Sequence, residues 1–207
     1  MNMLLDFRRG GYFYKYRSLD NLERFLSIII DRRLYGALYN EMNDPMEGYY
    51  KYDPSINKGL LQNIVNGKMK TYICSLSRCG NIGLMWTHYA DENKGCCLEV
   101  EVTSKTWHEV PVEYSTSMPE ITPATTAEDI LKVKAKMWEY EEETRFLSPE
   151  IEKDKHKPQL AIRINRILIG CNVDRTKFNH LSKVIKSLNK KIEIVKMHKD
   201  WLNYGYV

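Results

Sequence analysis

The order of the expected strands and helices is the feature of this sequence that most limits its fold. Segments with the residue alternation of strands outnumber segments with helical spacing, and the two kinds follow each other irregularly. A doubly wound parallel sheet requires a regular succession of strand and helix. The sequence therefore favours an α+β fold. We expect a single domain over residues 1–207, with split mixed or antiparallel sheets and flanking helices.

The expected elements follow from the spacing of apolar residues and from turn residues. Strands are expected at residues 12–16, 34–39, 70–77, 96–102, 110–114, 140–147, 160–169 and 192–197. Helices are expected after Ser18, over 55–67 and 84–90, from Thr125 to about Glu139, and over 174–188. Ser18 is the expected N-cap of the first helix, whose apolar stripe is Leu22, Phe25, Leu26 and Ile29. Thr125 with Glu128 has the pattern of a capping box.

The last strand–helix–strand segment is expected to be scaffold without ligand contacts. Its apolar residues fall on one face of each element, as core residues do. We expect four of them to be buried: Ile164, Phe178, Leu181 and Ile185.

Composition narrows the class of protein. The chain is 43% hydrophobic, enough to bury a core without disulfides or metals. The net charge of +4 is too small by itself to imply a nucleic-acid partner. An odd number of cysteines and one adjacent pair indicate reduced thiols: Cys74, Cys79, Cys96, Cys97 and Cys171. With no apolar segment of roughly 20 residues, we expect a cytoplasmic protein without a membrane partner.

Arg17 is a candidate phosphate ligand. It stands directly before Ser18, where a helix is expected to begin and free backbone N–H groups converge. A helix N-terminus beside a guanidinium suits a phosphate. The alternative is a surface arginine next to an ordinary cap.

The segment Asn43-Asp44-Pro45-Met46-Glu47 is expected to be a loop, because Pro45 continues neither a helix nor a central strand. The Asp44 carboxylate can accept hydrogen bonds from nearby backbone N–H groups and hold the loop. The alternatives are a ligand contact through Asn43, Asp44 or Glu47, or a metal held by the two carboxylates.

An aromatic and imidazole group lies between residues 84 and 91. Trp86, His88 and Tyr89 can stack on and hydrogen-bond a flat ligand ring. The alternative places Trp86 and Tyr89 in the core and leaves His88 exposed.

Two carboxylates and an arginine follow Tyr140. On a strand, Glu141, Glu143 and Arg145 would share one face. The two carboxylates should repel, so one pKa rises unless Arg145 or a ligand compensates. A solvated acidic face is the alternative.

Other common chemical motifs are missing from the sequence. Cys74 and Cys79 are badly spaced for zinc, and Cys96 and Cys97 would face opposite sides of a strand. There is no phosphate-binding P-loop, no dinucleotide-binding glycine pattern and no nucleophile elbow. We expect no metal cofactor.

Taken in order, the motifs resemble a bacterial family, the domain-of-unknown-function family 2971, over residues 12–200. The resemblance rests on the segments Tyr14–Ser18, Asn43–Glu47, Cys74–Ser77, Met85–Asp91 with Lys94-Gly95, Trp138–Arg145 and Ile167–Gly170. The Asn-Asp-Pro-x-Glu, Met-Trp-x-His-Tyr-Ala-Asp and Tyr-Glu-x-Glu-x-Arg patterns are its most specific parts. This family has no assigned activity.

The order of motifs is also similar to the Arg–Ser–Glu layout of toxin-type ADP-ribosyltransferases, and the first strand and helix resemble those of DNA-targeting members. This resemblance implies that Arg17 holds an NAD phosphate and that Ser77 supports the nicotinamide ribose site. It implies that Glu143 polarises the ribose 2′-hydroxyl and stabilises the oxocarbenium-like transition state, while Glu141 orients the acceptor. Tyr89 or Trp86 would stack on nicotinamide. The layout has no counterpart of Arg145. An arginine beside Glu141 and Glu143 can also serve only to neutralise these two carboxylates.

The resemblance predicts an ADP-ribosyltransferase-like enzyme that uses NAD as a substrate to modify a nucleic acid or a protein, in a toxin or anti-phage setting. It also predicts that Arg17, Tyr89 and Glu143 line one cleft. Two alternatives stay open. One is a non-catalytic module that binds a nucleotide or a partner. The other is a metal-dependent nuclease using Asp44, Glu47, Glu141 and Glu143.

Overall fold

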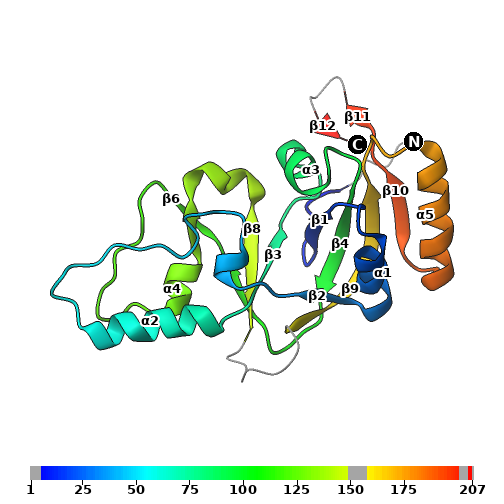
Figure 1. Cartoon of the computed structure of the whole chain (residues 1–207). Coiled ribbons are helices and arrows are strands. Elements are labelled where there is room, and N and C mark those ends of the chain that lie inside the picture. The colour runs from blue at the N-terminus through cyan, green and yellow to red at the C-terminus, as the bar shows by residue number, and fades with distance from the viewer. Residues whose placement is uncertain (1–5, 149–157, 201–204, 207) are drawn as a thin grey trace. The chain divides into compact units, whose positions relative to one another are not determined.

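The computed structural model describes residues 6–148, 158–200 and 205–206 (Figure 1). The chain divides into two compact units. Unit 1 comprises residues 1–34, 76–103 and 161–207, and unit 2 comprises residues 35–75 and 104–160. Helices and mostly antiparallel strands occur in both, which confirms the α+β class. The expectation of a single domain stays a prediction.

A mostly antiparallel sheet forms the centre of unit 1. Its strand order is β10 (Glu193–Lys196), β9 (Gln159–Ile169), β4 (Cys96–Val102), β1 (Phe13–Arg17) and β3 (Ile73–Ser77). Only Leu76 and Ser77 of β3 belong to this unit. β10 runs parallel to β9, and β2 (Arg33–Tyr35) also pairs with β9. A short hairpin of β11 (Lys199–Asp200) and β12 (Gly205–Tyr206) is separate.

Three helices belong to unit 1: α1 (Leu22–Asp31), α3 (Gly83–Tyr89) and α5 (Arg175–Leu188). The predicted cap of α1 is wrong, because Asn21 Oδ1 accepts the N–H of Arg24 at 2.8 Å. Ser18 instead accepts the N–H of Asp20 in the preceding turn. The later start rotates the buried face onto Phe25, Ile28 and Ile29, and leaves Leu22 exposed.

The predicted strand, helix and strand at the end of the chain are confirmed. The expectation that this segment makes no ligand contact stays a prediction, and Ile164 lines a groove of unit 1. Asp174 caps α5 by accepting the N–H of Lys177, and Ile164, Leu181 and Ile185 are buried. Phe178 is only half-buried. In the parts of the chain that the structure describes, no helix has the length and apolar character needed to cross a bilayer.

Unit 2 contains short strands and small helices. β5 (His108–Pro111) is antiparallel to β8 (Glu143–Leu147), and β6 (Glu113–Ser115) is parallel to β7 (Val133–Ala135). The helical segments are η1 (Tyr39–Glu41), α2 (Lys58–Lys70), α4 (Ala127–Leu131) and η2 (Lys136–Glu141). α2 and α4 lie side by side (Figure 1) and bury Ile64, Ile121 and Ile130 between them and the adjoining loop.

Several predictions for unit 2 are wrong. The expected helix up to Glu139 ends at Leu131, and residues 133–135 form β7 because they pair with β6. The capping box is formed by Thr126 and Asp129 rather than by the predicted pair, Thr125 and Glu128. Trp138, which falls in the predicted helix, lies in η2 and is only half-buried.

Candidate functional site

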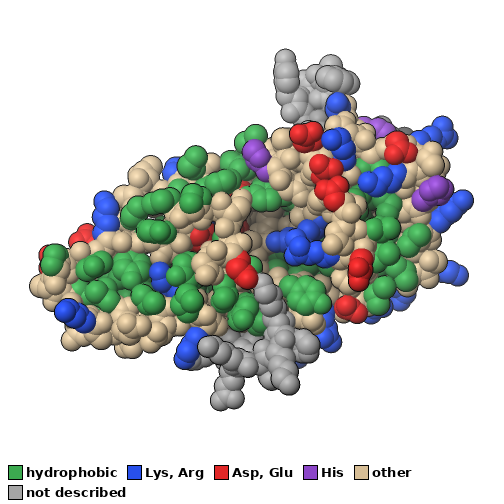
Figure 2. All heavy atoms as spheres, in the orientation of Figure 1, with side chains coloured by type: hydrophobic (Ala, Val, Ile, Leu, Met, Phe, Trp, Pro, Cys, Tyr) green, Lys and Arg blue, Asp and Glu red, His purple; other side chains and the backbone are tan. Residues whose placement is uncertain are grey.

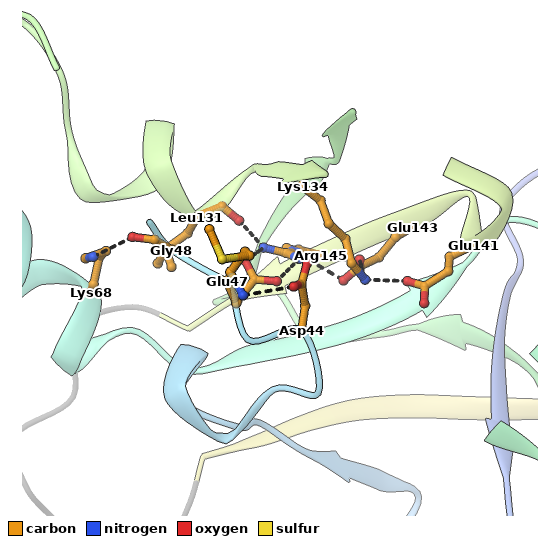
Figure 3. A network of polar contacts seen from close by, with 10 residues as sticks. Asp44, Glu47, Gly48, Lys68, Leu131, Lys134, Glu141, Glu143 and Arg145 are labelled. Atoms are coloured by element: carbon orange, nitrogen blue, oxygen red, sulfur yellow. Dashed lines mark hydrogen bonds and ion pairs between the residues drawn. The ribbon is translucent and has the colours of Figure 1, made fainter. Parts of the chain in front are cut away.

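A buried network of charged side chains occupies unit 2 (Figure 3). Glu143 and Arg145 stand on β8, Glu141 ends η2, and Lys134 stands in β7. Glu47 joins them from the loop after η1. Each of the five side chains is at most 5% exposed, so the network is shielded from bulk water. Such shielding strengthens the attraction between opposite charges and makes an unpaired charge costly.

Arg145 is the centre of the network. Its two terminal nitrogens bind the two carboxylate oxygens of Glu47 at 2.7 and 2.8 Å, the paired geometry that only a guanidinium provides. Its Nε donates to Glu143 at 3.0 Å, and Nη1 also donates to the carbonyl of Leu131. Arg145 therefore connects β8, the loop at Glu47 and the end of α4.

Lys134 is the second cation of the network. Its Nζ donates to Glu141 at 2.5 Å and to Glu143 at 3.0 Å, and lies 5.1 Å from the centre of the Trp138 ring. Glu143 thus binds both cations. The predicted common strand face is confirmed for Glu143 and Arg145, which stand two residues apart on β8. It is wrong for Glu141, because Glu141 lies in η2 and Glu142 has a φ of 46° before β8 begins.

The network has more carboxylates than cations. With Asp44, which is also buried, four acids face two cations. Burial tends to raise the pKa of Glu143, but Arg145, Lys134 and the Ser75 hydroxyl outweigh it and hold that pKa at about 2. Burial tends to lower the pKa of Lys134, but Glu143 and Glu141 raise it overall. The site therefore keeps the Glu143 carboxylate ionised at neutral pH.

Acid should remove the stabilisation that Glu143 provides. A depressed folded pKa gives stability that is present above the ordinary value of 4.5 and is lost as pH falls toward 2. We expect wild type to exceed Glu143→Gln in free energy of unfolding by about 3 kcal/mol at pH 6. The difference should shrink steadily between pH 4.5 and 2 in denaturant titrations. A pH-independent difference would contradict the assignment of this charge.

The loop Asn43–Glu47 separates two pockets of unit 2. Asp44 Oδ1 accepts the N–H of Met46 at 2.9 Å, which confirms the predicted loop-holding role of this carboxylate. One pocket, of about 200 Å³, has Asp44, Glu47 and Lys134 among its lining residues. The other, of about 550 Å³, shares Asp44 and Glu47. The charged network thus borders space that a ligand can occupy.

Tyrosines and one lysine give the larger pocket its character. Four tyrosines line it: Tyr39, Tyr49, Tyr50 and Tyr52. The buried Lys68 ammonium donates to the carbonyl of Gly48 at 2.7 Å and lies 4.8 and 4.6 Å from the ring centres of Tyr39 and Tyr50. Burial lowers the pKa of Lys68. Aromatic faces with a few polar groups are typical of pockets for flat organic ligands.

Metal ligation has little geometric support. Among the described residues, no three or more His, Cys, Asp or Glu side chains are grouped as a metal site. Glu47, Glu141 and Glu143 bind Arg145 or Lys134 instead. All five cysteines are free thiols.

In unit 1, Arg17 ends β1, four residues before Asn21, which caps α1, so its predicted place directly before the helix cap is wrong. Arg17, Asn21 and Arg24 help to line a pocket of about 150 Å³ there. Ser77 has a local role instead: its buried hydroxyl accepts the N–H of Cys79 and donates to the carbonyl of the same residue, both at 3.1 Å.

The aromatic segment forms α3 and divides between core and surface. Trp86 is fully buried, donates to the carbonyl of Gly80 at 3.1 Å and packs edge-on against Tyr16. This enclosure gives Trp86 a packing role in unit 1. His88 is exposed and Tyr89 half-buried, with their ring centres 6.4 Å apart.

The predicted site residues fall into two groups. Asp44, Glu47, Glu141, Glu143 and Arg145 meet within unit 2, and Asn43, next to Asp44 in the chain, is exposed. The other candidates belong to unit 1: Arg17, Ser77, Trp86, His88 and Tyr89. A common cleft for Arg17, Tyr89 and Glu143 stays a prediction.

Four buried charged residues are not among the candidates that the sequence indicates: Lys68, Glu99, Lys134 and Arg166. Lys134 falls in the predicted helix and Glu141 in the strand predicted after it, so the sequence gives no reason to pair them. Glu99 is fully buried in β4 and binds Tyr14, Arg9, Asn165 and Arg166. The available signal for Glu99 was an acid between Leu98 and Val100 in a largely apolar strand.

Comparison with known proteins identifies no relative of this chain. No family model, no curated protein and no solved structure matches the chain. The resemblances to the domain-of-unknown-function family 2971 and to ADP-ribosyltransferases therefore stay predictions.

Proposed function

We propose that the protein is an ADP-ribosyltransferase-like enzyme that transfers ADP-ribose from NAD to a nucleic-acid or protein acceptor. In this reaction the bond between the ribose and nicotinamide breaks, and nicotinamide leaves with the bonding electrons. The acceptor then forms a bond to the ribose carbon and releases a proton. Positive charge develops on the ribose in between, and the protein must stabilise it.

The observation that supports this proposal is the ionised Glu143 carboxylate, which the network in unit 2 holds in place. Glu143 stays ionised at neutral pH because Arg145 and Lys134 hold its pKa at about 2. A carboxylate that is already charged and fixed in position needs no reorganisation when positive charge appears nearby. Asp44 and Glu47 line two pockets, so the network borders space open to a ligand.

One observation favours a second candidate, a non-catalytic nucleotide-binding module. Glu143 binds two cations and its side chain is only 3% exposed, as in a network that serves stability. The tyrosine-lined pocket of about 550 Å³ would then hold the ligand without turnover. Release of nicotinamide from NAD by the full chain, with cell lysate as the source of acceptors, separates the two candidates.

Binding of NAD is expected to depend on Arg17. At a hundredfold excess over the dissociation constant, NAD should stabilise the fold by roughly 2.7 kcal/mol. Arg17→Ala should remove most of this gain, because the guanidinium is the proposed phosphate ligand. Thermal shift in the presence of NAD, ADP-ribose and AMP measures the effect. Arg175→Ala, an exposed arginine of α5, is the matched control. If NAD stabilises Arg17→Ala and Arg175→Ala equally, Arg17 is not the phosphate ligand.

A further inference from the structure

The two units carry opposite charge. Unit 1 contains 19 Lys and Arg against 11 Asp and Glu, a formal charge of +8, whereas unit 2 contains 12 against 16, a formal charge of −4. The overall charge of +4 hides this asymmetry. On the face that Figure 2 shows, Lys and Arg side chains lie over the elements of unit 1, including α5, interspersed with Asp and Glu. A strong excess of one sign within a compact unit attracts partners of the opposite sign.

Some of the cationic side chains of unit 1 line a groove. It has a volume of about 940 Å³, and five cationic side chains line it against one acid, Asp31. The five are Arg32, Arg33, Arg163, Lys190 and Lys191, and all are exposed. We call it the basic groove.

The fold explains why the basic groove exists. β10 pairs with β9 only from Arg166 onward, while the carbonyl of Arg32 accepts the N–H of Ile162. Residues 163–165 of β9 therefore lie between these two pairings, and the groove runs along them. The C-terminal ends of α1 and α5 form its sides. Buried Ile162 and Ile164 contribute to its apolar lining.

Helix dipoles account for only part of the charge. Cations are favourable at helix C-termini, and Arg32, Arg33, Lys190 and Lys191 all follow a helix end. Near the end of α5, however, Lys186 Nζ already donates to the carbonyls of Lys190 and Ile192. In the described chain, the ammonium groups of Lys190 and Lys191 contact no carboxylate. Arg163 stands on β9, away from both helix ends, and pairs with the exposed Glu101.

We propose that the basic groove binds the phosphate backbone of a single-stranded nucleic acid. Regularly spaced phosphates suit several cations along one groove, and the groove has the volume of a few nucleotides rather than of a duplex. No aromatic side chain stands among the described residues that line it, so base stacking is not available there. Binding should therefore be electrostatic and largely independent of sequence. The proposal does not rest on the transferase activity.

The test is fluorescence anisotropy of a labelled mixed-sequence single-stranded DNA with the full chain and no NAD. Neutralising five phosphates predicts a slope of about −3.5 for log affinity against log salt. Lys190→Gln with Lys191→Gln should weaken binding roughly tenfold and reduce the steepness of that slope by about 1.4. The control, Lys177→Gln with Lys183→Gln, removes the same charge from exposed positions of α5 outside the groove. It should change affinity less than about twofold.

Three results would overturn the proposal: no binding at low salt, equal loss in both double variants, or tighter binding of a duplex of the same sequence. Circular dichroism melting shows whether each variant is folded, since all four lysines are exposed and should be replaceable. Failure of the transferase assay leaves this measurement unchanged, so the two proposals fail separately.

Discussion

Arg145→Met is expected to lower the free energy of unfolding by roughly 3–5 kcal/mol, among the largest effects of any single substitution in this chain. The guanidinium is fully buried, and its loss leaves Glu47 without a cation and Glu143 with Lys134 alone. Methionine preserves much of the side-chain volume, so the lost charge rather than a cavity dominates the effect. Urea denaturation at pH 7 measures the change.

Two further variants identify the cause. Arg145→Lys keeps the charge but loses the paired contact to Glu47, so it should recover only part of the stability. Arg163→Met removes an arginine that pairs with Glu101 at the surface and should cost no more than about 1 kcal/mol. A loss below about 1 kcal/mol in Arg145→Met would show that the network contributes little to folding.

Glu143→Gln is expected to reduce nicotinamide release from NAD by about a hundredfold or more, which corresponds to about 2.7 kcal/mol of transition-state stabilisation. Glutamine has nearly the same size but no negative charge for the ribose cation. NAD affinity should change little, because the interaction is stronger in the transition state than in the ground state. Lys134 keeps Glu141 and Arg145 keeps Glu47 in this variant, so each cation retains an acidic partner.

The matched control is Glu139→Gln, an exposed residue of η2 that pairs with Lys136. It should retain wild-type turnover. Rates are compared per folded molecule, at a temperature below both unfolding transitions. Wild-type turnover in Glu143→Gln would eliminate the proposed role of this carboxylate. Binding of NAD without turnover in wild type would favour the nucleotide-binding module.

Some strands and one turn could be predicted from the sequence, because residues close together in the chain determine them. The bounds of β4 agree with the predicted 96–102, and β9 begins one residue before the expected 160. Alternating apolar residues between turn residues specify such strands without distant information. The Asp44 turn was predictable for a similar reason, because its carboxylate bonds a backbone N–H two residues away.

Tertiary structure decided the candidate site. Residues 133–135 follow a short helix and continue its sequence pattern, yet they become β7 because β6 offers hydrogen bonds from 20 residues earlier. That pairing places Lys134 between Glu141 and Glu143. Arg145 meets Glu47 across 98 positions of the chain. The sequence indicated the acids and the arginine as chemically suitable residues. Their partners, burial and ionisation depended on long-range packing, since the energy of a charge is set by the groups around it in space.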